Sequence, residues 1–120
     1  MFILTKKGLQ HLADPYITDG SVMAYGNWQS FNAPASRCLL VLDDSHLQIL
    51  SLNLFSTKVL YTQTIPLAEL EAIQLKQYVA TATFHFAYAK QGYRFQLPLA
   101  ILPLGNGQAA FLTRCQALVR

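Results

Sequence analysis

The sequence predicts a mainly β fold with one C-terminal α-helix: a barrel of about seven antiparallel strands, preceded by a short N-terminal helical segment. Two observations support this fold class. Apolar and polar residues alternate through most of residues 21–99, as they do in half-buried strands. In the last stretch, "NGQAAFLTRCQALVR", the apolar spacing changes to that of one face of a helix.

A single domain is expected, because the chain has 120 residues and compact domains usually hold about 100–150. We divide it into an N-terminal extension (residues 1–19), a β-barrel (20–104) and a C-terminal helix (106–119). Hydrophobic residues make up 52% of the chain and charged residues 12%. This composition excludes a disordered chain, and it favours apolar surface that a partner or a second copy covers.

The first elements are marked by spacing and by turn residues. Leu9 and Leu12 suggest one or two helical turns before the turn signal Asp14-Pro15. Residues 21–31, "SVMAYGNWQSF", are typical of a strand, "NAPAS" of a loop, and residues 37–43 of a second strand.

The third strand, within residues 47–54, has apolar side chains on both parities. Leu47 and Ile49 share one parity, whereas Leu50, Leu52 and Leu54 share the other. A strand with one buried face keeps a single parity, so the slip predicts a β-bulge near Ile49 and Leu50.

The fourth strand is predicted from Val59, Tyr61 and Ile65, which alternate with polar residues. It is expected to be half-buried and to end at Pro66, because proline cannot donate to a strand ladder. "PLAEL" then predicts a turn or short helical corner before a fifth strand at residues 72–78.

The strongest alternation predicts a β-hairpin across "AKQG", whose inward side chains supply much of the core. These side chains are Ala82, Phe84, Phe86 and Tyr88 in one strand and Tyr93, Phe95, Leu97 and Leu99 in the other. The final helix has an apolar stripe of Phe111, Cys115 and Leu118, widened by Leu112 and Val119, with Asn106 as its N-cap. The helix should therefore pack on the sheet.

Seven short antiparallel strands followed by one helix is the element order of the pleckstrin-homology (PH) superfold. The chain resembles the bacterial PH-like domains, a group close to GRAM domains, in "VMAYG", "LLVLDDSHLQILS", "IPLAELEAI" and "YRFQLP". The resemblance implies a non-catalytic scaffold for protein contacts or self-assembly, and less often for lipid. Family members commonly carry a basic pair in the hairpin turn, where this chain has Asp43, Asp44 and His46, so an anion-binding turn is not expected.

The polar stretch "DDSH" at residues 43–46 is the strongest candidate for chemistry, since carboxylates and an imidazole could bind metal or transfer protons. Asp and Ser also close hairpin loops through their own backbone, and we interpret the stretch as a turn. His11, His46 and His85 lie in separate segments, and the sequence has no G-x-S-x-G, H-E-x-x-H or Walker-type motif. We expect no enzyme activity, no cofactor and no metal site.

The compartment is predicted from the cysteines and the N-terminus. Cys38 and Cys115 lack C-x-x-C spacing and are interpreted as buried hydrophobic residues in a reducing environment. "MFILTKKG" places apolar residues before its lysines, the reverse of a secretory signal, and no apolar run is long enough to span a bilayer. We expect a cytoplasmic protein.

The charge pattern argues against nucleic acid as a partner. The net charge is +3, but the nine basic residues are scattered, whereas phosphate backbones are held by clusters. Arg37 and Lys58 could meet beside a lipid headgroup if their loops adjoin, yet two cations fall short of a specific pocket. Peripheral membrane binding is therefore the alternative function.

The leading prediction is contact with another protein or with a second copy of the chain. Trp28 and Phe55 are the aromatic residues that the core pattern explains least, and exposed aromatic residues often anchor interfaces. Trp28 shares its parity with Ala24, which leaves two alternatives, burial on the inner face or exposure. The first strand is uncharged, so a neighbour could pair with it near Asn27. The candidate contact residues are Trp28, Asn27, Phe55, Arg37 and Lys58.

Overall fold

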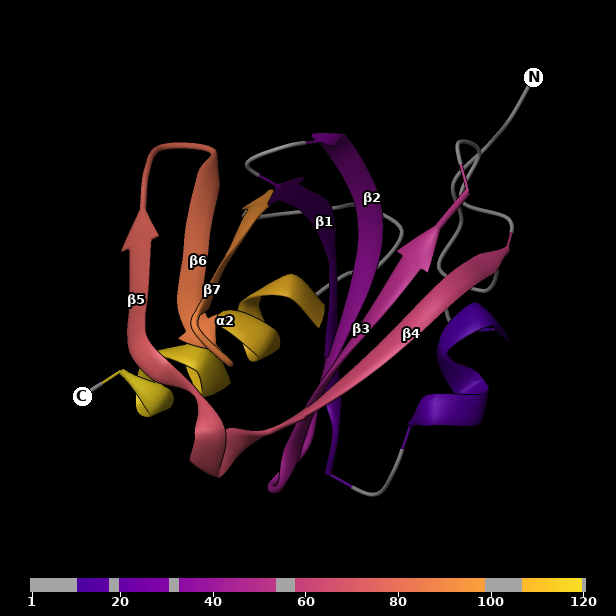
Figure 1. The fold of residues 1–120 in the computed structure, drawn as a ribbon, viewed down its shortest axis with the longest axis horizontal. Helices are drawn as coiled ribbons and strands as arrows, with labels where there is room; N and C mark the ends of the chain where they lie inside the picture. The colour runs from indigo at the N-terminus through magenta and orange to yellow at the C-terminus, as the bar shows by residue number, and fades with distance from the viewer. Residues whose placement is uncertain (1–10, 18–19, 31–32, 54–57, 99–106, 120) are drawn as a thin grey trace.

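The protein folds into one seven-stranded antiparallel sheet and a C-terminal helix (Figure 1). The structure is a computed structural model that describes residues 11–17, 20–30, 33–53, 58–98 and 107–119. The strands are β1 (Val22–Ser30), β2 (Ala33–Leu42), β3 (His46–Leu52), β4 (Val59–Pro66), β5 (Glu71–Gln77), β6 (Thr81–Tyr88) and β7 (Gln91–Pro98). The helices are the 3₁₀ helices η1 (Asp14–Tyr16) and η2 (Leu67–Glu69) and the α-helix α2 (Gly107–Leu118); residues 11–13 are helical as well. The predicted mainly β fold of seven antiparallel strands with one C-terminal helix is confirmed, and the strands form an open barrel whose edges are β4 and β5.

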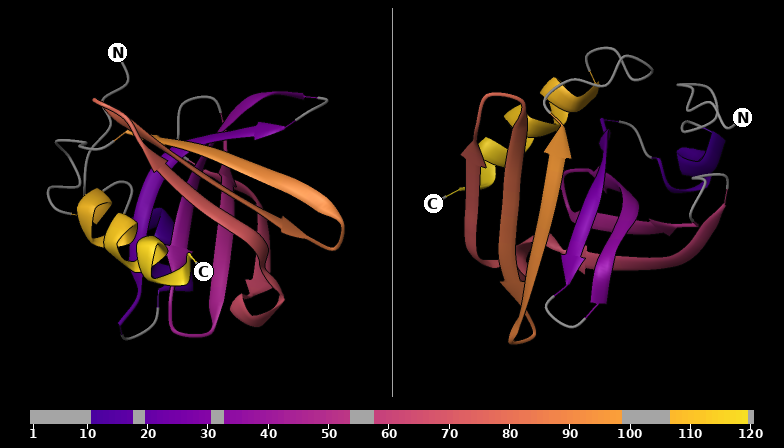
Figure 2. Two further views of the ribbon diagram at one scale, coloured as in Figure 1. Left: turned by 90° about the vertical axis from the view of Figure 1, so that its left-hand side faces the viewer. Right: turned by 90° about the horizontal axis from the view of Figure 1, so that it is seen from above.

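The sheet bends sharply where β7 meets β1. The strand order is β4-β3-β2-β1-β7-β6-β5, and β1 pairs with β2 over most of its length but with β7 only through residues 27–29. The two halves of the sheet therefore face each other, as Figure 2 shows. Gly26 lies at the bend, where the strands approach each other closely. A Cβ at this position would lie 2.6 Å from the carbonyl oxygen of Gln96, so a glycine is needed there.

The main core lies between the two halves of the sheet and α2. Phe84, Phe86, Phe95 and Phe111 are almost completely buried at its centre, and Phe84 meets Phe111 edge-to-face at a centroid distance of 6.3 Å. α2 lies at one end of the barrel, opposite the β6–β7 turn (Figure 2). The predicted inward register of the hairpin and the predicted packing of the helix on the sheet are confirmed for the described residues.

Gln108 joins α2 to the bend in the sheet. Its side chain is fully buried, and its Oε1 accepts a hydrogen bond of 2.6 Å from the Tyr25 N–H. Its Nε2 donates to the carbonyl oxygens of Tyr25 at 3.0 Å and Pro98 at 2.7 Å. β7 pairs with β1 only through residues 27–29, so it does not reach Tyr25. The Gln108 amide therefore makes the hydrogen bonds to the Tyr25 backbone that a neighbouring strand would otherwise make.

A second apolar cluster covers the outer face of β2 and β3. Leu39, Val41, Leu50 and Leu52 are buried there against Ala13 from the N-terminal segment. The same segment is held to β3 by a hydrogen bond of 3.0 Å from Gln48 Nε2 to the carbonyl oxygen of Tyr16. Both faces of these two strands are therefore buried.

The prediction of a bulge near Ile49 and Leu50 is wrong. β3 pairs with β2 without interruption from Cys38 opposite Ser51 to Leu42 opposite Leu47. Leu50 faces the outer cluster and Ile49 faces the main core, so burial on both faces produces the two parities. A register shift does occur in this strand, but it lies at its end, between Ser51 and Leu52 opposite β4.

One strand boundary and one exposure differ from the sequence-based prediction. β2 begins at Ala33, so most of "NAPAS" belongs to a strand that pairs back onto β1. β4 ends at Pro66 and is followed by η2, as predicted, but Tyr61 is 73% exposed although it was expected on the buried side. Three predictions concern residues outside the described part of the chain: the parity of Leu54, the core position of Leu99 and the N-cap role of Asn106.

Candidate functional site

The "DDSH" stretch forms the turn between β2 and β3, as predicted. Asp43 Oδ1 accepts hydrogen bonds of 2.7 Å from the backbone N–H groups of both Ser45 and His46. Asp44 forms an exposed ion pair with Arg114 of α2, with 3.0 Å between Oδ1 and Nη2. Local backbone contacts and this ion pair account for both carboxylates, so the turn is a structural feature of the hairpin.

Among the residues that the structure describes, no group of three His, Cys, Asp or Glu side chains is arranged to hold a metal ion. Cys38 and Cys115 are buried free thiols, as the sequence predicts. Burial raises the pKa of Cys38 to about 12, and burial also raises the pKa of Cys115, which the nearby Arg114 only partly offsets. Neither thiol is an activated nucleophile at neutral pH.

Trp28 lies on the inner face of β1, the first of its two predicted alternatives. Its ring stacks on Tyr93 at 5.7 Å with an interplanar angle of 18°, and it lies 5.8 Å from Phe95. The side chain is half-buried against the main core. Trp28 is therefore part of the aromatic packing of the barrel rather than a freely exposed anchor.

Asn27 lies in the interior of the sheet, and this overturns the prediction that a neighbouring chain pairs with β1. It is opposite Arg37 on β2 and opposite Gln96 on β7. The bend in the sheet makes β1 a central strand, a property that its uncharged sequence does not reveal. Strand pairing with another chain is available to edge strands, which are β4 and β5 among the described strands.

Arg37 and Lys58 are both exposed, but the two strands to which they belong or lead are not adjacent. Arg37 belongs to β2 and Lys58 directly precedes β4, and β3 lies between these two strands. The backbone N–H of Lys58 donates a hydrogen bond of 3.1 Å to Asn53 Oδ1, which fixes the start of β4. Phe55 lies outside the described residues.

The large apolar side chains that are exposed lie elsewhere. Leu60 and Tyr61 on β4 are 55% and 73% exposed, and Tyr78 and Val79 at the β5–β6 turn are 56% and 100% exposed. The sequence analysis missed all four as surface residues. A signal was present for the first pair, because no charged residue occurs in Val59–Pro66, but only the strand order shows that β4 is an edge.

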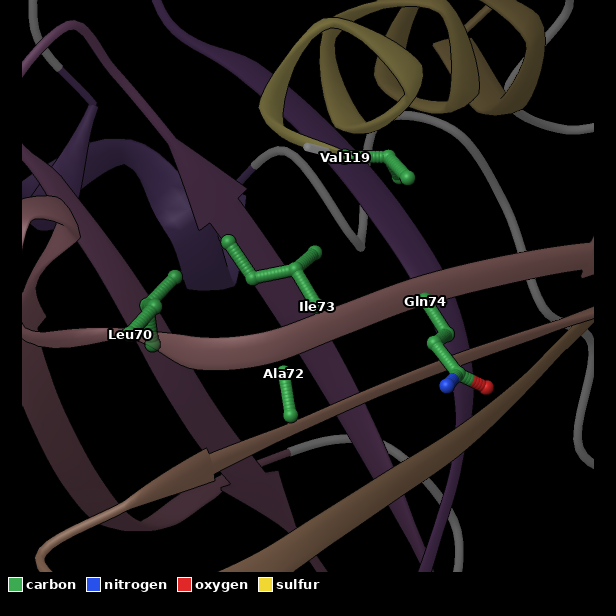
Figure 3. A pocket seen from close by; sticks show the side chains of 5 residues that line it. All are labelled: Leu70, Ala72, Ile73, Gln74 and Val119. Carbon is green, nitrogen blue, oxygen red and sulfur yellow. The ribbon is translucent and has the colours of Figure 1, made fainter.

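An open groove of about 290 Å³ lies between β5 and the end of α2, lined by Leu70, Ala72, Ile73, Gln74 and Val119 (Figure 3). Leu70 and Ile73 point to the same side of β5 as Val119, whereas Gln74 points to the other side. Ala72 has a φ of 53°, within the irregularity that interrupts the β5–β6 register. The lining has a single amide and no titratable group, which suits apolar contact better than catalysis.

No helix in the described part of the chain is long and apolar enough to cross a membrane.

Two solved structures share this fold at low sequence identity. The hSac2 domain from the human phosphoinositide phosphatase Sac2 matches with a TM-score of 0.55 and 15% identity, covering 92% of this chain and 75% of that chain. The C-terminal domain of an unknown protein from Leishmania infantum matches with a TM-score of 0.50 and 13% identity, covering 96% and 94%. No family model and no curated protein sequence matches the chain. The seven-stranded antiparallel sheet and these neighbours support a PH-like fold, and at such identities the likeness extends to the fold alone.

Proposed function

We propose that this chain is a non-catalytic PH-like module that works through protein contacts, including contacts between its own copies. The proposal rests on two pairs of exposed apolar residues. The members of each pair are consecutive in the sequence: Leu60 with Tyr61, and Tyr78 with Val79. Single exposed apolar residues are normal on protein surfaces. Adjacent pairs that include a tyrosine are typical of contact surfaces, because tyrosine combines large apolar area with a hydroxyl group.

Membership of the bacterial PH-like group and a cytoplasmic location belong to the same proposal. The four similar sequence pieces all lie on the sheet framework: "VMAYG" within β1, "LLVLDDSHLQILS" across the β2–β3 turn, "IPLAELEAI" from β4 into β5, and "YRFQLP" within β7. They are framework pieces, so they support a shared scaffold rather than a shared ligand. A net charge of +3 without a basic cluster favours a protein partner over nucleic acid.

Binding to an anionic lipid surface is the second candidate. The exposed cations Arg37, Lys90 and Arg94 favour it, since Lys90 lies in the β6–β7 turn and Arg94 is opposite Gln29 of β1. The neighbour described as a domain of a phosphoinositide phosphatase fits the same idea. Single dispersed cations near an anionic leaflet contribute only about 1 kcal/mol each, which ranks lipid binding second.

Sedimentation equilibrium of the purified chain and vesicle flotation together test the proposal. We expect a solution mass above that of the 13.4 kDa monomer at high micromolar concentration. We expect weak binding to phosphatidylserine vesicles that disappears at about 1 M salt, where the Debye length falls to about 3 Å.

The two candidate functions differ in what the charged residues do. The double variant Arg37→Ala/Arg94→Ala, which removes two exposed cations away from β4, should leave the solution mass unchanged, as should the control Lys76→Ala on β5. Tight, headgroup-selective vesicle binding that the double variant loses and the control retains would replace protein contact with lipid binding as the function.

A further inference from the structure

The two edge strands of the described sheet differ in how well they are protected against pairing with another chain. β5 (Glu71–Gln77) carries Glu71 and Lys76, has an irregular register at Ala72 and borders the end of α2. Charged residues and bulges are common devices that keep an edge strand from pairing with a neighbour. β5 is therefore a guarded edge.

β4 (Val59–Pro66) has a register shift only at its start, beside Leu60, and a proline only as its last residue, so the stretch from Tyr61 to Ile65 has none of these devices. It contains no charged residue, and its register with β3 is continuous from Ser51 opposite Tyr61 to His46 opposite Pro66. Leu60, Tyr61, Thr62 and Thr64 are all exposed. In an antiparallel pair, every second residue directs its backbone N–H and C=O away from the partner strand. The outer edge of β4 therefore presents unguarded donors and acceptors beside exposed apolar side chains.

We propose that β4 pairs in an antiparallel direction with β4 of a second copy of this chain, across a two-fold axis. The inference rests on the proposed function and names its surface and its partner. It replaces pairing at β1, which the strand order excludes. The joined sheet would be continuous through both copies, and Leu60 and Tyr61 of each copy would be covered.

The charges at the two ends of β4 favour a second copy in this direction. Lys58 directly precedes the strand, and the exposed Glu69 follows it in η2. Antiparallel pairing brings the Lys58 end of each copy to the Glu69 end of the other, whereas parallel pairing would bring like charges together. An uncharged strand with opposite charges at its two ends is complementary to itself, as a two-fold interface requires.

The position of Thr62 makes the interface testable by charge. Thr62 lies near the middle of the strand, is exposed and is opposite Leu50 of β3. With the two-fold axis at Thr62, antiparallel pairing sets each Thr62 opposite its own copy and Val59 opposite Ile65, which places the two Thr62 side chains close together on one face. Thr62→Lys would bring two like charges together in the pair, and we expect a dimer dissociation constant at least about tenfold higher. Thr62→Glu should weaken the dimer in the same way.

Mixing the two variants is the decisive measurement, carried out by sedimentation equilibrium at high micromolar concentration. The mixture should recover the dimer mass, because lysine then meets glutamate, and a variant that is merely unstable would not recover. Gln74→Lys, an exposed substitution on the guarded edge, should leave the mass unchanged. Thermal unfolding followed by circular dichroism checks that each variant is folded, and Thr62→Glu alone supplies the comparison of solution mass if Thr62→Lys does not fold.

The outcomes separate this inference from the function on which it rests. An oligomeric wild type that Thr62→Lys leaves intact, or a mixture that stays monomeric, would overturn pairing through β4 and keep self-association through another surface. A monomeric wild type at high micromolar concentration would overturn self-association itself, together with the β4 interface.

Discussion

At the scale of single residues, Gln108 shows how this chain satisfies buried polar groups. Its amide bonds to both backbone groups of Tyr25 and to the carbonyl oxygen of Pro98. All buried side-chain polar atoms in the described part of the chain have a hydrogen-bond partner. Such a network is stable because it is complete, and removal of one member leaves the others buried without partners.

Gln108→Leu should lower the free energy of unfolding by at least about 1–3 kcal/mol, because an unpaired buried N–H or C=O costs that much. Leucine is similar in size, so the loss measures the hydrogen bonds more than the packing. Urea unfolding at neutral pH, followed by circular dichroism, gives the difference. A midpoint equal to that of the wild type would show that the strand does not depend on this amide.

Gln108→Glu should be destabilised in a pH-dependent way. Two carbonyl oxygens and burial would raise the pKa of the new carboxyl group above its usual value of about 4.3 in the folded chain. The folded chain then holds a proton that the unfolded chain has lost, so stability falls as pH rises from the unfolded pKa to the folded pKa. The deficit relative to the wild type should be smaller at acidic pH than at neutral pH. A deficit that is the same at both would contradict this account.

At the scale of elements, the contact between β1 and β7 depends on a glycine. A Cβ at Gly26 would lie 2.6 Å from the Gln96 carbonyl oxygen and would also meet the Leu97 side chain. A Cβ at Gly92, near the start of β7, would meet nothing within 4 Å. The two positions form a matched pair, since both are glycines in strands and only one lies at the bend.

Gly26→Ala should cost about 1–3 kcal/mol or more, because overpacking against backbone forces the strands apart. Gly92→Ala should change stability by less than about 0.5 kcal/mol, as surface substitutions usually do. Denaturant unfolding of both variants measures the contrast. Equal effects would mean that the two strands can separate at the bend without loss.

The β6–β7 hairpin supplies the aromatic centre of the core. Phe86 is 2% exposed and stacks on Tyr93 at 5.1 Å with an interplanar angle of 12°. Phe86→Ala should therefore cost about 3–5 kcal/mol through lost burial and the cavity that remains. Phe86→Leu should cost less, because it keeps most of the volume. A thermal midpoint close to that of the wild type for Phe86→Ala would contradict the central position of this ring.

At the scale of the whole molecule, β2 and β3 are covered on both sides, and the outer cover is the N-terminal segment. Ala13 is fully buried there against Leu39, Val41, Leu50 and Leu52. The helical residues of the extension are therefore a structural part of the sheet packing.

Ala13→Asp should release this segment, because a carboxylate is costly to bury without a partner. The outer face of β2 and β3 would then be exposed, so we expect increased binding of the dye ANS with the sheet signal in circular dichroism retained. The matched control is Asp14→Ala, which changes an exposed neighbour and should leave dye binding unchanged. Full unfolding of the Ala13→Asp variant would show instead that the sheet cannot form without its outer cover.

The sequence predicted the features that depend on local pattern and missed those that depend on long-range order. The alternation around Phe84 and Phe86 identified the hairpin and its buried face, because the register of two adjacent strands is fixed by side-chain parity. The double parity of β3 fits a bulge and a two-sided core equally well, and only the position of the N-terminal segment distinguishes them.

The candidate contact residues illustrate the same limit. The parity of Trp28 indicated the inner face, where the side chain lies. The uncharged β1 looked like an edge, yet an equally uncharged strand, β4, occupies that position. The order of strands in a sheet follows from the distant β1–β7 contact, which no local pattern of charge or hydrophobicity encodes.

The hydrogen bond from the Tyr25 N–H to Gln108 also makes the Tyr25 amide proton a probe of the movement of α2, separate from the opening of strands. Most amides within an antiparallel sheet are bonded to a neighbouring strand, so their exchange with deuterated water follows the opening of strands. The Tyr25 amide is bonded to a side chain of α2, and it is released when the helix moves away while the sheet stays paired. Its exchange rate, compared with that of amides within the β2–β3 hairpin, therefore measures the free energy that holds the helix in place.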